Sequence, residues 1–299
     1  MSKPAIVTHG GAGASAAFSD GPERAAKRGL LLLQQNKTAL EGAIEAAIDL
    51  EDDPRFNAGT GSNLRLDGAT LEMDAAVMTS DGKSGAVANL AAVKNPVLVA
   101  AEVRARTPHL LLAGEGALRF ARRLGFAAYD PITERAKEKL AWAKRGLKGL
   151  EDDDEEFGKW RDIDIKSLWN FEKDADECLG DTIGAVARDV HGNFAVAAST
   201  GGTLVMLRGR IGDTPLIGCG LFAGPFGAVT ATGVGEEIVK RFLSRTVYDW
   251  LAQGVSPQEA CERGVALFPH EIGVGVLAVG KEGVGKASNR DMPAAALEG

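Results

Sequence analysis

The chain has 299 residues and a formal net charge of −7, and 45% of its residues are hydrophobic. This length suits one large domain or two medium ones with a sizeable core. No dense basic cluster indicates a nucleic-acid surface, and no apolar run approaches the ~20 residues of a membrane span.

The N-terminus, the cysteines and the histidines bear on compartment and metal binding. The stretch Met1–Val7 lacks the long apolar segment of a signal peptide. The cysteines, Cys178, Cys219 and Cys261, are odd in number and have no CxxC spacing, which favours reduced thiols. The histidines have no metal-ligand spacing. We therefore expect a cytoplasmic protein with no catalytic metal and no nucleic-acid or membrane partner.

The first predicted elements are a strand, a glycine loop and two helices. Ala5–Thr8 is a short apolar strand that leads into the glycine-rich loop His9–Ala14. This loop lacks both the GxGxxG spacing and the GK[ST] ending, so it indicates a nucleotide site only weakly. A helix is predicted over 22–36, and a second one follows Thr38–Glu41, which has the form of a capping box. The polar loop Arg55–Leu64 comes next.

Proline marks two predicted helix starts in the next part of the chain. Asn95-Pro96 and Thr107-Pro108 both resemble an N-cap followed by a first-turn proline. The predicted elements are a hairpin over 65–78 that turns at Asp67-Gly68, a strand over 84–93, and helices over 95–106 and 107–125.

A charged segment precedes the second half of the chain. A helix is predicted over 133–147, and the acidic run Glu151–Glu156 follows it. Such runs are usually solvated, and the pattern stays poor up to Cys178. Residues 148–178 are therefore predicted to be a flexible linker that leads to Thr182.

The second half alternates apolar strands with glycine loops. Its order of strands and helices favours sheets covered by helices on their outer faces. The predicted elements are strands over 182–189 and 193–199 joined at His191-Gly192, strands over 216–221, 228–232 and 272–279, a helix over 235–252, and a helix capped by Ser256-Pro257.

Thr182, within Gly180–Ala187, allows two interpretations. As a β-branched residue it suits the start of a strand. If the chain were cut before it, Thr182 would gain a free α-amino group with a pKa of about 7.7–8.0. That value suits a general base, so one residue would supply both nucleophile and base. The octapeptide alone leaves both interpretations open.

Three later stretches also have ordinary readings when each is taken alone. Thr200, in Ser199–Gly202, could serve as a turn hydroxyl. Arg210 and Asp213 could form a surface ion pair of little energetic value. Thr232-Gly233 could cap the helix that follows.

Taken together, these stretches resemble the plant-type asparaginase / isoaspartyl peptidase family of N-terminal nucleophile hydrolases, which also includes glycosylasparaginase. The resemblance implies an α+β fold, a four-layer αββα sandwich in a single domain. It also implies self-cleavage between Asp181 and Thr182 into residues 1–181 and 182–299, and a homodimer of the cleaved units. The matching stretches are His9–Gly13, Phe56–Ser62, Met73–Ala75 and 181–235.

The resemblance also implies a role for each site residue. Thr182 would be the nucleophile and Thr200 would position it, while Thr232 and the Gly233 N–H would form the oxyanion hole. Arg210 would hold a substrate α-carboxylate and Asp213 an α-ammonium. The other implied substrate-binding residues are Ile211, Gly212, Val234, Gly235, Asn57, which would support the nucleophile, and Gly10, through its backbone.

The chemistry of these residues agrees with a β-amide substrate. L-Asparagine presents a carboxylate, an ammonium and a carbonyl, and the predicted cation, anion and oxyanion donors match them in kind. Each oxyanion donor commonly contributes about 3 kcal/mol. The expected substrates are L-asparagine and isoaspartyl dipeptides, with no required cofactor. The resemblance further allows a structural sodium ion held by backbone carbonyls of residues 50–60.

Alternatives remain open at this stage. Asp181 resembles the glycosylasparaginase branch, whose substrate is N-acetylglucosaminyl-asparagine. The apolar stretches Thr203–Met206 and Phe222–Phe226, expected beside the pocket, suit a small amide or a peptide better than a sugar. A protein that binds an amino acid but never matures is an alternative of another class.

Overall fold

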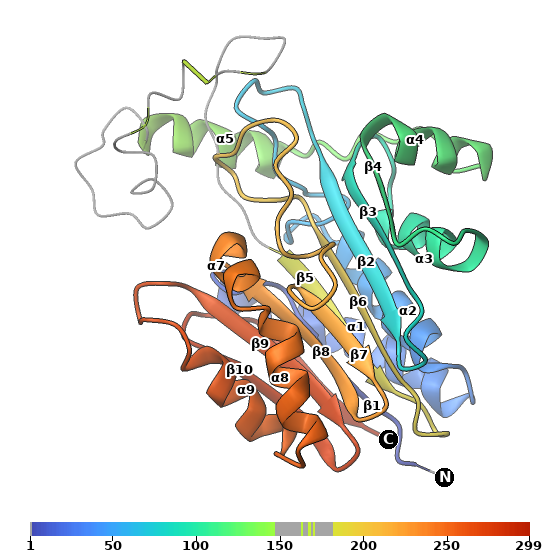
Figure 1. Ribbon diagram of the computed structural model, residues 1–299. Coiled ribbons are helices and arrows are strands. Elements are labelled where there is room, and N and C mark those ends of the chain that lie inside the picture. Colours follow the sequence, from blue (N-terminus) through green and yellow to red (C-terminus); the bar gives the residue numbers. More distant parts are fainter. Residues whose placement is uncertain (1, 147–162, 164–166, 169, 171–181) are drawn as a thin grey trace.

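The computed structural model describes residues 2–146, 163, 167–168, 170 and 182–299. Most of the predicted linker, together with Cys178 and Asp181, lies outside these residues. The described residues form two β-sheets with helices packed against them, so the fold is mixed α/β (Figure 1).

The larger sheet combines both halves of the chain. It has seven strands in the order β11-β1-β5-β6-β2-β3-β4, and only the β3–β4 pair is parallel. The central pair β5–β6 from the second half lies between β1 and β2 from the first half. The strands are β1 (Ala5–His9), β2 (Met73–Thr79), β3 (Ser84–Leu90), β4 (Leu111–Ala113), β5 (Thr182–Arg188), β6 (Phe194–Thr200) and β11 (Ala294–Glu298).

The smaller sheet packs against the larger one. Buried apolar side chains from both sheets, among them Val7, Val186 and Leu277, form one core cluster between them. This sheet is antiparallel in the order β10-β9-β8-β7. Its strands are β7 (Leu221–Gly224), β8 (Gly227–Gly233), β9 (Val274–Gly280) and β10 (Gly283–Ser288).

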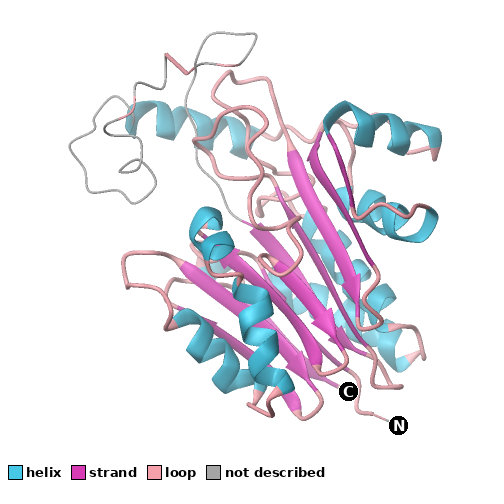
Figure 2. Cartoon of the chain, viewed as in Figure 1, coloured by secondary structure: helices cyan, strands magenta, loops and turns pink. Residues whose placement is uncertain are grey.

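Helices pack on the sides of the sheets that face away from each other. Helices α1 and α2 contact the larger sheet, and α8 and α9 contact the smaller one (Figures 1 and 2). Among the described residues, no helix has both the length and the apolar character needed to cross a membrane. The helices are α1 (Asp20–Gln34), α2 (Ala39–Glu51), α3 (Pro96–Arg106), α4 (Gly114–Arg123), α5 (Glu134–Gly146), α7 (Gly235–Lys240), α8 (Leu243–Ala252) and α9 (Pro257–Val265), with a 3-10 turn at Ala16–Phe18.

Three predictions based on local capping and turn signals are confirmed. Thr38 caps α2 in a complete capping box with Glu41, and Ser256 caps α9 with proline in its first turn. The β5–β6 hairpin turns at His191-Gly192, as expected. Asp189 holds this turn, because its Oδ1 accepts the N–H groups of His191 and Asn193 at 2.9 Å each.

Two helix predictions were wrong. Thr107 does not begin a helix: its hydroxyl donates to the Val103 carbonyl and so ends α3, after which come β4 and α4. The helix expected over 235–252 divides at Phe242, whose φ of +46° is left-handed and interrupts the helical hydrogen bonding.

Two strand predictions also failed, and four strands were missed. Residues 216–220 form turns, because the Asp213 carbonyl accepts the N–H groups of Leu216 and Gly220 at 2.9 and 3.1 Å. The Asp67-Gly68 turn exists, but residues 65–72 contain no strand. The hairpin expected over 65–78 therefore does not form, and β2 pairs instead with β3 and β6. The missed strands are β4, β7, β10 and β11.

His9 and Gly184 meet at the interface between the two sheets. Burial lowers the pKa of His9 to about 3, and its Nδ1 accepts the Gly11 N–H at 3.1 Å, so the ring is neutral. A Cβ placed on Gly184 would lie 2.6 Å from His9 Nε2 and 3.0 Å from Thr230. The sheets therefore pack too closely at this point for any side chain on β5.

Gly184→Ala should lower the melting temperature, because the added methyl has no space between His9 and Thr230. Overpacking of this kind costs about 1–3 kcal/mol. Gly116→Ala in α4 is the matched control, since nothing lies within 4 Å of its Cβ position and alanine favours a helix. Thermal scans that show equal melting temperatures for the two variants would contradict this packing.

Candidate active site

Thr182 and Thr200 stand directly opposite each other at the end of the central hairpin. Strands β5 and β6 run antiparallel to each other, and their register pairs Thr182 with Thr200. Their hydroxyl oxygens lie 3.0 Å apart, within hydrogen-bonding distance. Thr200 is buried, whereas Thr182 is partly exposed. The hairpin thus presents one accessible hydroxyl that contacts a second, fixed one.

Asn57 holds the loop that follows Thr200. The side-chain Nδ2 of Asn57 donates to the Gly202 carbonyl at 2.8 Å, and the backbone carbonyl of Asn57 accepts the Gly201 N–H at 2.9 Å. The Gly202 N–H in turn donates to the Thr200 hydroxyl at 3.0 Å. A Cβ on Gly201 would lie only 2.3 Å from Asn57 Oδ1, so this close approach requires glycine. Asn57 therefore contacts the threonine pair indirectly, because it holds Gly202 and Gly202 donates to Thr200.

Thr232 is the next-to-last residue of β8 and lies on the face of that strand that points to the larger sheet. Gly184 on β5 lies against Thr230 on β8, and Thr182 and Thr232 each lie two residues from this contact. Residues two apart share a face of a strand. The two threonine side chains therefore project into the space between the same two sheets.

The first glycine loop reaches this region through a residue that sequence reasoning did not single out. The Ala12 N–H donates to the Thr232 hydroxyl at 3.2 Å. Gly10, in contrast, donates its N–H to the Pro293 carbonyl, and its Cα packs against the Phe56 ring. The loop thus contacts Thr232 at Ala12, while Gly10 joins the loop to Pro293 and to the buried Phe56 ring.

Gly233 has a conformation that excludes a side chain. Its φ is +136°, and a Cβ there would lie 2.2 Å from the Gly273 carbonyl oxygen. Val234 follows as the N-cap residue of α7, and its N–H donates to the same carbonyl at 3.1 Å. The chain therefore turns sharply between the end of β8 and the start of α7.

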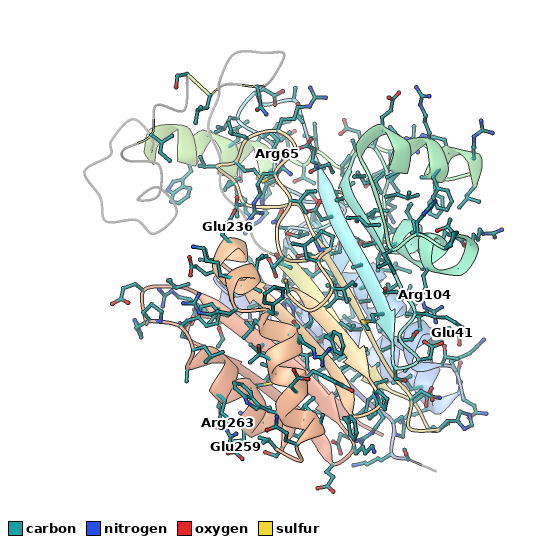
Figure 3. The ribbon with its side chains drawn as sticks, viewed as in Figure 1. Glu41, Arg65, Arg104, Glu236, Glu259 and Arg263 are labelled. Atoms are coloured by element: carbon teal, nitrogen blue, oxygen red, sulfur yellow. The ribbon has the colours of Figure 1, made fainter. Side chains whose placement is uncertain are left out.

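The guanidinium of Arg210 forms a two-point ion pair with Glu236, not with Asp213. Its Nε and Nη2 donate to the two Glu236 carboxylate oxygens at 2.9 and 2.8 Å. Burial disfavours the charge of Arg210, but the bonds from Glu236 outweigh it and raise the pKa. Figure 3 labels Glu236 close to α7. Sequence reasoning missed this partner, although Glu236 directly follows the matching stretch 181–235.

The two predicted substrate-binding stretches do meet. A Cβ on Gly235 would lie 2.8 Å from Arg210 Nη2 and 2.9 Å from Asp213 Oδ1. A Cβ on Gly212 would lie 2.8 Å from Arg210 Nη1. Both glycines therefore leave room for the guanidinium and the carboxylate to approach the same backbone. Ile211, on the same loop, is 37% exposed.

Asp213 is a buried carboxylate that lacks a full set of partners. It is 5% exposed, and its Oδ2 has no hydrogen-bond partner within the described residues. Burial raises its pKa to about 7, although the Arg210 charge opposes that shift. An orphaned buried carboxylate needs a donor or a cation. A ligand ammonium would meet this need.

Asp74 supports the Arg210–Asp213 loop from behind. It lies on β2 opposite Thr200, and its carboxylate accepts the N–H groups of Asn89 at 2.8 Å and Gly212 at 3.4 Å. Burial raises its pKa to about 6. Its position in the quoted Met73–Ala75 stretch was the available sequence signal, but that signal carried no role.

The apolar stretches predicted beside the pocket separate in the structure. Leu204, Val205 and Met206 are buried close behind Gly202. Phe222–Phe226 instead lies at the β7–β8 turn, at the opposite end of β8 from Thr232, where Phe222 packs on Tyr248. The stretch was expected beside the pocket, but it runs away from Thr232: Phe222 pairs with Val229 in the middle of β8, and Gly224 pairs with Gly227 at the far end.

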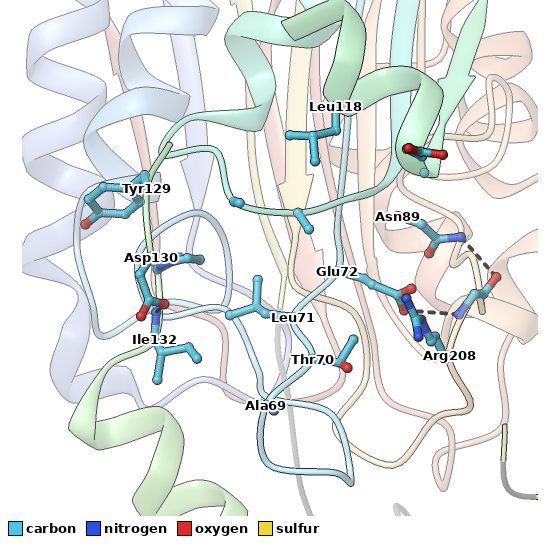
Figure 4. Close-up of a pocket in the computed structure, with 16 residues that line it drawn as sticks. Ala69, Thr70, Leu71, Glu72, Asn89, Leu118, Tyr129, Asp130, Ile132 and Arg208 are labelled. Atoms are coloured by element: carbon cyan, nitrogen blue, oxygen red, sulfur yellow. Dashed lines mark hydrogen bonds between the residues drawn. The ribbon is translucent and has the colours of Figure 1, made fainter. Parts of the chain in front are cut away.

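A cavity of about 620 Å³ adjoins the other side of the substrate-binding loop. Glu72, Asn89, Arg208 and Gly209 line one wall, and Leu71, Leu118 and Ile132 supply apolar surface (Figure 4). None of the three threonines lines it.

Comparison with known proteins identifies the family of this chain. A sequence model of the family described as asparaginase matches residues 2–297. A plant-type L-asparaginase of Pyrococcus furiosus is 41% identical over 298 residues, which cover 95% of this chain and 93% of that protein. A human protein named isoaspartyl peptidase/L-asparaginase is 37% identical over 310 residues, which cover 99% of this chain and 93% of that protein.

The region described above contains a pair of threonine hydroxyls, a partly exposed arginine and a buried carboxylate. The family match extends over nearly the whole chain, and the relatives align over nearly their whole length. The chain therefore belongs to the asparaginase family, a family of hydrolases.

L-Aspartate should bind less tightly as the pH falls below about 7. Asp213 is ionised above its pKa of about 7, and only the ionised form attracts the ligand ammonium. Below the pKa, Kd should rise by up to about tenfold per pH unit. Calorimetric titration between about pH 5.5 and 8 measures this dependence.

Asp213→Asn should raise Kd at least about tenfold at pH 8 and flatten the pH profile. Asp249→Asn is the control, because that carboxylate is 44% exposed and pairs with Arg245 on the surface of α8. An unchanged slope in Asp213→Asn would show that another group sets the pH dependence.

Proposed function

We propose that this protein is an N-terminal threonine amidohydrolase that converts L-asparagine and β-aspartyl (isoaspartyl) peptides to L-aspartate. The observation that carries the proposal is the 3.0 Å contact between the Thr182 and Thr200 hydroxyls at the end of a strand. Arg210 and Asp213 supply the charges that a free α-carboxylate and α-ammonium require. The names of the relatives support the same substrates.

The proposed reaction begins at Thr182. Its free amine takes the proton of its own hydroxyl, and the oxygen attacks the β-carbonyl carbon of the substrate. The Thr232 hydroxyl and the Gly233 N–H stabilise the oxyanion. The protonated amine then gives its proton to the departing ammonia or amine, which leaves a β-aspartyl ester on Thr182. Water, activated by the same amine, hydrolyses the ester and releases aspartate.

Thr200 would orient the nucleophile in this scheme. Its oxygen already accepts the Gly202 N–H, which favours Thr200 as the donor in the contact with Thr182. A hydroxyl that donates to the nucleophile stabilises the negative charge that develops on deprotonation. Thr200→Val should therefore slow the chemical step more than it weakens substrate binding.

Maturation by cleavage of the Asp181–Thr182 bond is part of the proposal. The Thr182 hydroxyl would attack the preceding carbonyl in an N→O acyl shift, and hydrolysis of that ester would free the amine. The products, 1–181 and 182–299, would stay associated as one domain, because β5 pairs with β1 of the first segment. We propose that this domain is the four-layer αββα sandwich implied by the resemblance. Its homodimeric association and its cytoplasmic location stay predictions.

A structural sodium ion also fits the residues of the 50–60 loop. Cβ atoms on Gly59 would lie 2.6 Å from the Glu51 carbonyl oxygen and 2.9 Å from that of Lys94. One on Gly61 would lie 2.7 Å from the carbonyl oxygens of both Pro54 and Phe56. Hard cations prefer such oxygen ligands. We propose that these carbonyls hold sodium and that the ion only stabilises the loop.

Thr182→Ala should abolish both chain cleavage and turnover, because the nucleophile serves both reactions. Mass spectrometry should show one uncut chain of about 31.2 kDa for the variant, and wild type should give a second N-terminus reading Thr-Ile-Gly-Ala. Ammonia release from L-asparagine and aspartate release from isoaspartyl dipeptides measure turnover. Thr107→Val, at the end of α3, should cut and turn over like wild type.

Other results would redirect the assignment. A wild-type chain that stays uncut yet binds L-aspartate would favour the amino-acid-binding alternative. A preference for N-acetylglucosaminyl-asparagine would favour glycosylasparaginase. Release of neither ammonia nor aspartate from any of these substrates by a fully cut protein would refute the proposed function.

Sodium chloride should raise the melting temperature above that in tetramethylammonium chloride at equal ionic strength, because only sodium fits a carbonyl cradle. The difference should disappear in Gly59→Ala, whose methyl would occupy the cradle. Gly116→Ala should keep it. A sodium effect of the same size in both variants would place the ion elsewhere.

A further inference from the structure

The largest fully buried side chain is a cation, Arg65. It is 1% exposed and lies in the loop before β2, outside every role that the resemblance implies. Removing a charge from water is costly unless it is paired and hydrogen-bonded. The contacts of Arg65 therefore indicate which parts of the structure its burial holds in place.

One side of the guanidinium holds the loop that follows Thr200. Nη1 donates to the Gly201 carbonyl at 2.8 Å and to the Asn63 carbonyl at 3.1 Å. A Cβ on Gly202 would lie 3.2 Å from Nη2, so the guanidinium lies directly against this loop. Gly201 is the residue after Thr200, and its carbonyl thus has a charged donor.

The other side holds Glu72, and through it the substrate-binding loop. Nη2 donates to the Glu72 carbonyl, and Nε lies 3.5 Å from Glu72 Oε2. The same Oε2 accepts the Gly209 N–H at 3.0 Å, one residue before Arg210. Figure 4 shows Glu72 and Asn89 on the same wall as Arg208. Asn89 donates to the Gly209 carbonyl at 3.1 Å.

The geometry points to Arg65 as a positioning residue that ties the nucleophile loop to the substrate-binding loop. Through the Gly201 carbonyl it fixes the backbone that carries Thr200, and through Glu72 it fixes the start of the Arg210 loop. This inference rests on the proposed function, because it assigns Thr200 and Arg210 their roles.

An arginine suits this position because its planar head presents several donors in fixed directions. The Nη atoms of Arg65 donate to three carbonyls, and the guanidinium also forms an ion pair with the Glu72 carboxylate. A lysine ammonium is a compact charge on a flexible stem and cannot reproduce that fork. The side chain therefore fixes directions as well as balancing the Glu72 charge.

The test separates positioning from charge balance with four variants. Arg65→Met removes both charge and donors, and Arg65→Lys keeps the charge. Arg65→Met/Glu72→Gln restores a neutral pair, and its glutamine oxygen can still accept the Gly209 N–H. Arg188→Met is the matched control. Arg188 is 4% exposed and donates to the carbonyls of Lys3, Gly280 and Lys281. It is the last residue of β5, at the other end of the strand from Thr182.

We expect kcat per cleaved chain on L-asparagine to fall at least about tenfold in Arg65→Met and in the double variant. Arg65→Lys should be intermediate. The double variant should regain melting temperature but not kcat, with KM within about twofold of Arg65→Met. Arg188→Met should lose melting temperature and keep kcat.

Full recovery of kcat in the double variant would overturn the inference, because Arg65 would then only balance charge. Equal kcat in Arg65→Met and Arg188→Met would overturn it as well. Wild-type turnover shows whether the proposed function itself holds. A crystal structure of the double variant tests positioning without turnover: the Thr182–Thr200 oxygen distance should exceed the 3.0 Å of the native chain, and an unchanged distance would refute it.

Discussion

The register of the β5–β6 hairpin is the constraint on which the rest of the site depends. It places Thr182 directly opposite Thr200, and a slip of one residue would turn every side chain of the strand to the other face. Asp189 fixes that register at the far end, because its carboxylate accepts the N–H groups of His191, Asn193 and, from α2, Ala39. The geometry of the two hydroxyls is therefore set partly by a turn at the opposite end of the sheet.

Buried charges hold the loops around this hairpin. Arg65 pairs with Glu72, and the carboxylates of Glu72 and Asp74 accept backbone N–H groups. Arg210 and Asp213 lie against the backbone at Gly235. Burial raises the pKa of both Asp74 and Asp213, so their ionised forms are held at a cost in stability. Such sites exchange stability for preorganised charges that need not reorganise when a ligand binds.

Local signals in the sequence predicted what is local in the structure. The Thr38 capping box, the hairpin at His191-Gly192 and the helix after Ser256-Pro257 are each specified by a few adjacent residues. The interruption at Phe242 has no glycine or proline to mark it, and the turns over 216–220 close on the Asp213 carbonyl, a role that its residue type does not signal. Strand β11 was missed because its partner β1 lies at the other end of the chain, whereas β10 forms a local hairpin with β9 that the sequence reading overlooked.

The same distinction applies to the site. The asparaginase resemblance brought together Thr182, Thr200 and Arg210; the structure pairs Thr182 with Thr200 and places Arg210 near Gly212 and Gly235. It did not predict the Arg210–Glu236 pair or the Arg65–Glu72 pair, because both join residues by the direction of side chains rather than by spacing. A resemblance transfers positions, whereas hydrogen-bond partners depend on this chain's own packing.

The charges around Arg210 explain why a zwitterion suits the site better than a simple anion. Glu236 already occupies the Nε and Nη2 edge of the guanidinium, so a ligand carboxylate must approach the remaining donors near Gly212 and Gly235. Any anion placed there also faces the Asp213 carboxylate, which repels it when ionised. A ligand whose ammonium contacts Asp213 removes that repulsion and adds an attraction. Under the proposed function, discrimination against ligands that lack an α-amino group would follow from Glu236 and Asp213 acting together, with Arg210 shared between protein and ligand.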